Sequence, residues 1–243
     1  MCELCTIARQ PRIARRNVLK LVGLAAAGLA IAPRAFAKET KAPPKPENVL
    51  SPDAALDRLM KGNTRYIDGL TKRHDFKHER EVLSGGQNPF AAVLSCADSR
   101  IAPELCFDTA RGDVFVCRVA GNFANDDIVA SLEYAVAVLN TPLIVVLGHG
   151  ACGAVDATIK SIKDGTTLPG HLPSLVAALR PAVEAVKDKP GDLLANAIRS
   201  NVMLTVDKLK SAAPILKAAV DDKKIRVVGG VYELKTGQVE LLS

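Results

Sequence analysis

Four short apolar runs, separated by segments of helical periodicity, constrain the fold of this chain most strongly. The run LIVVLGH is continuous rather than alternating, which is typical of a strand buried on both faces of a parallel sheet. The apolar runs cover residues 91–96, 114–120, 143–149 and 225–234, and the helical patterns cover residues 125–139, 153–164, 171–188 and 192–210. This alternation predicts an α/β domain with a mostly parallel central β-sheet flanked by helices.

The amino-terminal segment has the pattern of an export signal. Basic residues 12–20 precede the apolar run LVGLAAAGLAIA and an Ala-Phe-Ala site at residues 35–37. Arg15-Arg16 resembles the pair of a twin-arginine signal. We expect a signal peptide over residues 1–37, cleavage after Ala37, and a periplasmic or secreted protein with no stable membrane anchor. An uncleaved amphipathic tail is the alternative.

The segment after this signal predicts a linker and then a single domain. Residues 38–50 are rich in proline and lysine, which is typical of an extended linker. Ser51-Pro52-Asp53 is a helix start, so a single folded domain is expected over residues 51–243. Most of the formal charge of +6 falls in residues 1–37, and tryptophan is absent. We therefore expect no nucleic-acid partner.

Two cysteines and a histidine are predicted to meet at one edge of the sheet. Cys96 ends the first apolar run and His149 ends the third, and the carboxyl ends of parallel strands share an edge. Cys152 follows His149 in a glycine-rich turn, where glycine permits close folding of the backbone. Two thiolates and an imidazole suit zinc, and three protein ligands leave a fourth position open, as in catalytic sites.

The remaining cysteines and histidines leave alternatives open. Cys106 or Cys117 could complete a structural zinc site, or the two could be buried free thiols or a disulfide. A disulfide between Cys96 and Cys152 is a further alternative in an oxidising compartment. Cys2 and Cys5 precede the signal's apolar run, and His74 and His78 lie in a mostly charged stretch, so a metal site is improbable at either pair.

Two motifs resemble those of the β-carbonic anhydrases. They are Cys96-Ala97-Asp98-Ser99-Arg100 and His149-Gly150-Ala151-Cys152, and the likeness continues through FVCRVAGN, SLEYAV and GGVYELKTGQVELL. The resemblance implies the β-carbonic anhydrase fold, with one zinc ion per subunit. It implies reversible hydration of carbon dioxide to bicarbonate and a proton through a zinc-bound hydroxide. It also implies a homodimer or a dimer of dimers.

The resemblance also assigns roles around the metal. Asp98 and Arg100 match the acid-base dyad of the family, with Asp98 orienting the zinc hydroxide. Gln87, nine residues before Cys96, matches a glutamine that hydrogen-bonds the substrate. An ordinary surface ion pair is the plain alternative for Asp98 and Arg100.

The pocket implied by the resemblance is of the plant type. Phe115 and Tyr134 match residues that line an apolar pocket, Tyr134 from across a dimer interface, and the backbone of Gly153 borders the site. Val93 stands where some bacterial members carry a tryptophan of a non-catalytic bicarbonate site, so this second site is not expected.

Two rival functions remain at this point. A related zinc hydrolase would act on carbonyl sulfide or carbon disulfide with nearly the same site chemistry. A zinc-binding module without turnover is the second rival, and the set of Asp98, Arg100 and Gln87 argues against it.

Overall fold

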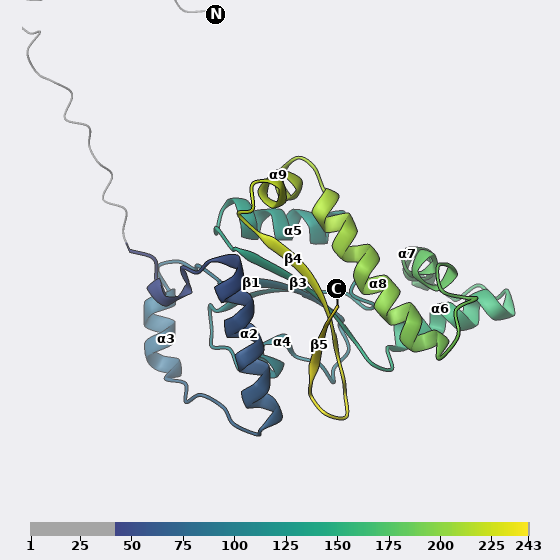
Figure 1. The fold of residues 1–243 in the computed structure, drawn as a ribbon, viewed down its shortest axis with the longest axis horizontal. Coiled ribbons are helices and arrows are strands. Elements are labelled where there is room, and N and C mark those ends of the chain that lie inside the picture. Colours follow the sequence, from purple (N-terminus) through teal and green to yellow (C-terminus); the bar gives the residue numbers. More distant parts are fainter. Residues whose placement is uncertain (1–41, 243) are drawn as a thin grey trace, which may run out of the picture. The chain divides into compact units, whose positions relative to one another are not determined.

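A five-stranded sheet forms the centre of the computed structural model, which describes residues 42–242 (Figure 1). The strand order is β2-β1-β3-β4-β5, and every neighbouring pair is parallel except β4 with β5. The strands are β1 (Ala91–Ser95), β2 (Val114–Arg118), β3 (Leu143–His149), β4 (Arg226–Tyr232) and β5 (Val239–Leu242). The mostly parallel α/β sheet is thus confirmed. The predicted signal peptide, Cys2 and Cys5 lie outside the described residues.

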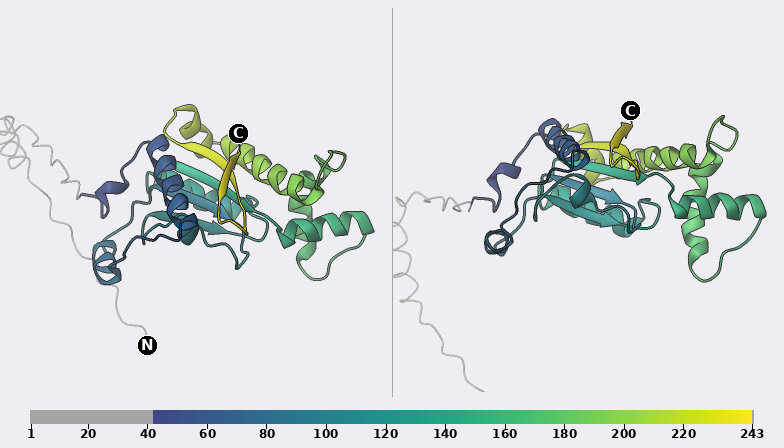
Figure 2. Two further views of the ribbon diagram at one scale, coloured as in Figure 1. Left: turned by 60° about the horizontal axis from the view of Figure 1, so that its bottom comes forward. Right: turned by 90° about the horizontal axis from the view of Figure 1, so that it is seen from below.

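Helices cover both faces of this sheet, as the unalternated strands require. The helices are η1 (Pro46–Asn48), α2 (Pro52–Ile67), α3 (Phe76–Leu83), α4 (Pro103–Cys106), α5 (Asp126–Ala137), α6 (Gly153–Asp164), α7 (Leu172–Glu184), α8 (Leu193–Ser211) and α9 (Ile215–Asp221). One core cluster joins α5, α8 and α9 to the sheet, and another joins α2 and α4 to its other face. Helices α6 and α7 lie together beyond one end of the sheet (Figures 1 and 2). Within the described residues, no helix is long and apolar enough to cross a membrane.

Local signals place most helix starts correctly. The Ser51 side chain accepts from the backbone N–H of Ala54, and that of Asn125 accepts from Ile128, so both act as N-caps. The helices α3, α4 and α9 were not expected: α3 forms in the charged stretch that contains His78, and α4 and α9 are short helices without a clear apolar period. The fifth strand is an unpredicted antiparallel return after β4.

The predicted linker is only partly an extended segment. Lys45 pairs with Asp113, and the buried Asn48 donates from Nδ2 to Asp113 Oδ1 at 3.2 Å. Because Asp113 is itself buried just before β2, these contacts dock Lys45–Asn48 on the domain. Within the predicted linker, Pro46–Asn48 thus form a short 3-10 helix held against the domain.

Candidate metal centre

Three buried side chains converge beyond the carboxyl ends of β1 and β3. Cys96 follows β1, His149 ends β3, and Cys152 is the N-cap of α6. Their ligand atoms all lie within 4.8 Å of one another, and this is the only such group among residues 42–242. The structure thus brings together all three predicted metal ligands.

The ring of His149 presents one nitrogen to this centre. Nδ1 lies 2.9 Å from the carbonyl oxygen of Gly150, so Nδ1 carries the proton and donates it there. The opposite nitrogen, Nε2, is buried and has no hydrogen-bond partner. A buried imidazole nitrogen without a partner is costly unless a ligand occupies it, so Nε2 fits a coordinating atom.

The two thiols form a coupled pair. Hydrogen bonding from Cys152 lowers the pKa of Cys96, and His149 and the backbone N–H of Gly121, 3.2 Å from Sγ, act in the same direction. The neighbouring Cys96 and burial together raise the pKa of Cys152, because a second negative charge beside the first is unfavourable. A dication between the sulfurs would let both ionise, and a donor set of two thiolates and one imidazole suits zinc.

In the turn that leads to Cys152, the residue with a left-handed backbone conformation is an alanine. Ala151 adopts φ 50°, in the left-handed region that non-glycine residues seldom occupy. The flanking Gly148, Gly150 and Gly153 lie outside that region, which corrects the expectation that glycine permits this turn by backbone freedom. Gly148 is needed for another reason: a Cβ there would lie 2.6 Å from Val202 Cγ2 of α8.

Asp98 is held beside the centre by Arg100. Its Oδ1 accepts from the backbone N–H and from Nε of Arg100, both at 2.9 Å, and its Oδ2 accepts from Nη2 at 2.7 Å. The Asp98 Oδ2 atom lies 3.8 Å from His149 Nε2. The hydrogen bonds from Arg100 hold the pKa of Asp98 below its usual range, so the carboxylate stays ionised.

A further arginine supports this loop, and no role was assigned to it from the sequence. Arg118 ends β2 and donates from Nε to the carbonyl of Cys96 and from Nη2 to the carbonyls of Asp98 and Ile101. The only signal that could have found it was its position inside the FVCRVAGN segment, because backbone acceptors leave no trace in a sequence.

The predicted pocket residues do not gather at the metal centre of their own chain. Gln87 is exposed and precedes β1, so the strand's five residues, roughly 16 Å of chain, separate it from Cys96. Phe115 pairs in register with Ala92, near the same end of β1, and its ring centroid lies 6.4 Å from that of Tyr134.

Gly153, by contrast, does lie at the centre. It directly follows Cys152 at the start of α6, and a Cβ there would meet nothing within 4 Å. The backbone of Gly153 thus faces open space beside a predicted metal ligand, and its role at the border of the site stays a prediction.

Of the alternatives for Cys106 and Cys117, the structure shows buried free thiols. Cys106 and Cys117 are buried in core clusters on opposite faces of the sheet, so they cannot bond to each other or reach Cys96 together. Burial raises the pKa of Cys106 to about 12, as expected for an inert thiol. Cys96 and Cys152 are likewise free thiols.

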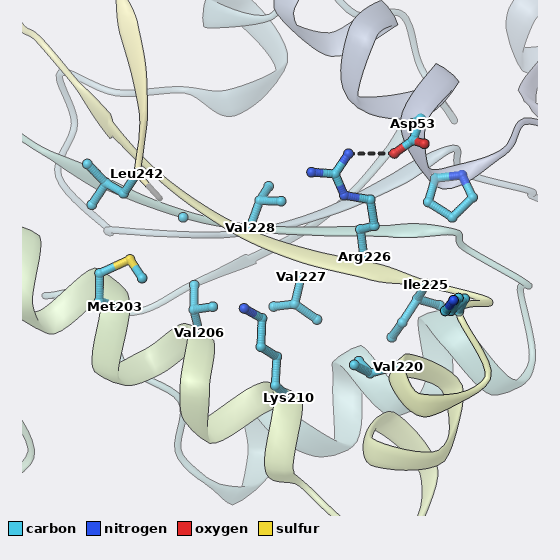
Figure 3. Close-up of a pocket in the computed structure, with 13 residues that line it drawn as sticks. Asp53, Met203, Val206, Lys210, Val220, Ile225, Arg226, Val227, Val228 and Leu242 are labelled. Carbon is cyan, nitrogen blue, oxygen red and sulfur yellow. Dashed lines mark hydrogen bonds and ion pairs between the residues drawn. The ribbon is translucent and has the colours of Figure 1, made fainter.

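A large cavity of about 570 Å³ lies away from the metal centre (Figure 3). It opens between α8, α9 and the first residues of β4, with Val206, Val227 and Leu242 in its apolar lining. The paired Arg226 and Asp53 stand on one side of it. None of the three metal ligands lines it, so its size alone does not mark it as the reactive site.

Known proteins are similar to this chain in sequence and in fold. The family model described as carbonic anhydrase matches residues 91–239. Carbonic anhydrase 2 of Mycobacterium tuberculosis is 36% identical over 192 residues, covering 79% of this chain and 93% of the relative. The solved structure of the β-carbonic anhydrase CcaA aligns with a TM-score of 0.59 at 26% identity, over 77% of this chain and 95% of CcaA.

A more distant structure supports the fold alone. A tetrameric β-carbonic anhydrase from Sordaria macrospora aligns with a TM-score of 0.60 at 23% identity, over 79% of this chain and 95% of that one. Sheet topology, the Cys-His-Cys centre and these relatives agree, and the chain belongs to the β-carbonic anhydrase family.

Proposed function

We propose that the protein is a zinc-dependent carbonic anhydrase, which hydrates carbon dioxide reversibly to bicarbonate and a proton. The observation that carries this proposal is the position of the Asp98 carboxylate. It is fixed by Arg100 and lies 3.8 Å from the partnerless Nε2 of His149. A structural zinc site has no use for an ionised, oriented carboxylate beside its metal.

Cys96, His149 and Cys152 would hold zinc, which when bound supplies a Lewis acid that lets water ionise near neutral pH. The two thiolates offset the charge of the dication, and the nearby guanidinium of Arg100 restores some local positive charge. Asp98, kept ionised, accepts a hydrogen bond from the attacking water and so directs an oxygen lone pair toward carbon dioxide. Arg100 acts through Asp98 and also donates to the carbonyl of Ala151 at 3.2 Å, which links the two loops.

The rest of the pocket is proposed to come from a second subunit. Gln87, Phe115 and Tyr134 do not lie at the metal centre of their own chain. Strand β2, which contains Phe115, is an edge strand of the sheet. Tyr134 is 47% exposed and Val138, one helical turn later, is 57% exposed, which leaves an apolar surface beside that edge. Association of two copies through this surface would complete a plant-type pocket. In the dimer of dimers that the sequence resemblance also implies, two such pairs would associate.

Export is proposed on the sequence pattern alone. The twin-arginine-like segment and the Ala-Phe-Ala site would direct the folded protein to the periplasm and leave Lys38 as the first residue. Mass spectrometry of the exported protein tests this, and a mature mass that includes residues 1–37 contradicts it.

Stopped-flow hydration of carbon dioxide by metal-analysed protein is the decisive experiment for the activity. We expect one zinc per chain and, for Asp98→Asn, retained zinc with kcat/KM lowered about a hundredfold or more, because amide cannot replace an ionised acceptor. Asp156→Asn, at an exposed pair with Lys160, is the matched control. A wild-type protein that contains one zinc per chain but does not hydrate carbon dioxide favours either a hydrolase of carbonyl sulfide or carbon disulfide, or a zinc-binding module without turnover. Assays with carbonyl sulfide and carbon disulfide distinguish the hydrolase from the module.

A further inference from the structure

The loop of residues 96–101 carries both a metal ligand and the carboxylate of the site, and one side chain binds its backbone at three places. Arg118 Nε donates to the Cys96 carbonyl at 2.9 Å, and Nη2 donates to the carbonyls of Asp98 at 2.7 Å and Ile101 at 2.9 Å. The three acceptors span the loop from its first residue to its last. Arg118 forms no ion pair within residues 42–242, so its charge is directed at these carbonyl dipoles.

The loop has little other support on this side. Apart from the bonds to Arg118, three contacts hold its backbone locally: the Ile101 N–H donates to the Asp98 carbonyl at 3.3 Å, the Arg100 N–H to Asp98 Oδ1 at 2.9 Å, and the Ser95 hydroxyl to the Cys96 carbonyl at 3.4 Å. The backbone bond that joins the loop to the end of β2 runs from the Ala97 N–H to the Val119 carbonyl at 3.3 Å. The two bonds to Arg118 at Cys96 and Asp98 are shorter, and charge-assisted donors give stronger hydrogen bonds than neutral ones. Arg118 is therefore the main contact that fixes both functional residues of the loop relative to β2.

We propose that Arg118 is a positioning residue of the metal centre, which sets the backbone of residues 96–101 so that Cys96 and Asp98 are presented in register with His149. The expected effect of Arg118 on catalysis rests on the proposed carbonic anhydrase function. Its expected effect on zinc retention does not depend on the substrate. Arg118 contacts only backbone in this chain, so it acts through Cys96 and Asp98 and not on the reacting atoms.

The guanidinium group suits this role better than an ammonium. Its planar fork has fixed donors that reach separate acceptors at the same time, whereas lysine offers one point of charge on a flexible stem. The Arg118→Lys variant is thus expected to keep the charge and some of the contacts. The Arg118→Gln variant loses the charge, and its shorter side chain is expected to lose most of the contacts.

The test compares Arg118→Gln and Arg118→Lys with Arg199→Gln, which removes an exposed arginine bound to Glu240. Each variant is saturated with zinc, and kcat and KM are measured separately by stopped-flow hydration. Release of zinc to excess chelator is timed on the same samples. We expect Arg118→Gln to release zinc about tenfold faster or more, and to lose about ten- to a hundredfold in kcat/KM, mainly in kcat. Arg118→Lys should fall between it and the wild type, and Arg199→Gln should match the wild type.

Two outcomes overturn the proposal. One is zinc release and kcat/KM of Arg118→Gln equal to those of Arg199→Gln. The other is normal kcat/KM in zinc-saturated Arg118→Gln, which would leave Arg118 without influence on Asp98. If Arg118→Gln does not fold, Arg118→Lys with wild-type rates in both assays overturns the proposal by itself. A wild-type protein without hydration activity would defeat the proposed function, while the zinc-release comparison would still decide the role of Arg118.

Discussion

At the scale of single residues, the centre depends on backbone positions that ordinary side chains seldom adopt. Ala151 occupies the left-handed region between His149 and Cys152, and its carbonyl accepts from Arg100. A left-handed alanine costs about 1–2 kcal/mol relative to a right-handed one. The turn between two metal ligands therefore carries strain that its sequence does not relieve.

Replacing Ala151 with glycine should stabilise the protein. The Ala151→Gly variant removes the steric penalty but adds freedom to the unfolded chain, so a net gain of about 0.5–1 kcal/mol in the free energy of unfolding is expected. Denaturant unfolding at fixed zinc concentration measures it. Ala157→Gly, inside α6, should instead destabilise by about 1 kcal/mol. A loss of stability in both variants would show that the left-handed turn is not strained.

The residue scale also shows where prediction from sequence ends. Cys96, His149 and Cys152 were identified because strand ends and ligand chemistry leave a recognisable pattern. Arg118 was not assigned a role because its partners are carbonyl oxygens, which every residue possesses. Likewise the left-handed position was expected among the glycines, and the structure places it at Ala151.

At the scale of elements, the packing of α2 depends on a buried carboxylate. Asp108 is left-handed at φ 43° with a side chain only 3% exposed, and its Oδ2 accepts from Arg65 of α2 at 2.5 Å. Its Oδ1 accepts from Thr71 at 2.8 Å and from the backbone N–H of Lys72 at 3.1 Å. Burial acts to raise the pKa of Asp108, but these hydrogen bonds outweigh it and lower the pKa. The carboxylate thus ties α2 to the segment that leads into α3.

The Asp108→Asn variant should destabilise the domain by about 2 kcal/mol at neutral pH, since asparagine tolerates the same backbone but leaves Arg65 unpaired. Because the folded pKa lies below the ordinary value, this stability is present above about pH 3.9 and is lost as the pH falls further toward the folded pKa. The difference in unfolding free energy between wild type and variant should therefore be constant from pH 7 to about pH 5 and should narrow as the pH falls below about 3.9. Asp57→Asn, at an exposed pair, should show a difference below about 1 kcal/mol throughout. A gap independent of pH would contradict this account.

For elements with a strong apolar pattern, the predicted bounds agree with the structure within a few residues, whereas elements without such a pattern were not predicted. The run at 143–149 coincides with β3, and the pattern at 153–164 coincides with α6. Strand β5 was missed because its four residues gain their strand conformation from pairing with β4, not from their own pattern. Helix α3 was missed because it has no buried residue, so no apolar stripe marks it.

At the scale of the whole molecule, a single chain brings its three metal ligands together, whereas the predicted pocket residues Gln87, Phe115 and Tyr134 lie apart from them. Gln87 and the Phe115–Tyr134 pair lie toward the opposite end of β1 and β2 from Cys96. The resemblance assigns these residues to one pocket, and that assignment stays a prediction, because which subunit each residue serves depends on association, which a sequence does not record.

Disrupting the exposed end of α5 should therefore impair activity without removing the metal. Val138→Arg places a charge in the proposed interface, and we expect a monomer by light scattering, one zinc per chain and at least about a tenfold loss of kcat/KM. Leu172→Arg, at the 46% exposed start of α7, is the matched control and should keep both assembly and activity. A monomeric but fully active Val138→Arg protein would rule out a shared pocket.

The neighbouring strands β1 and β3 are separated in the chain by the whole crossover through β2 and α5. Cys96 therefore meets His149 only after that long loop has closed, a non-local step that is slow compared with helix formation. Zinc capture at full affinity would thus follow the completion of the crossover and would report on it. A chain in which β3 has not yet paired with β1 contains all three ligand residues but has no assembled metal centre. Bound metal would therefore mark the chains that have completed this crossover.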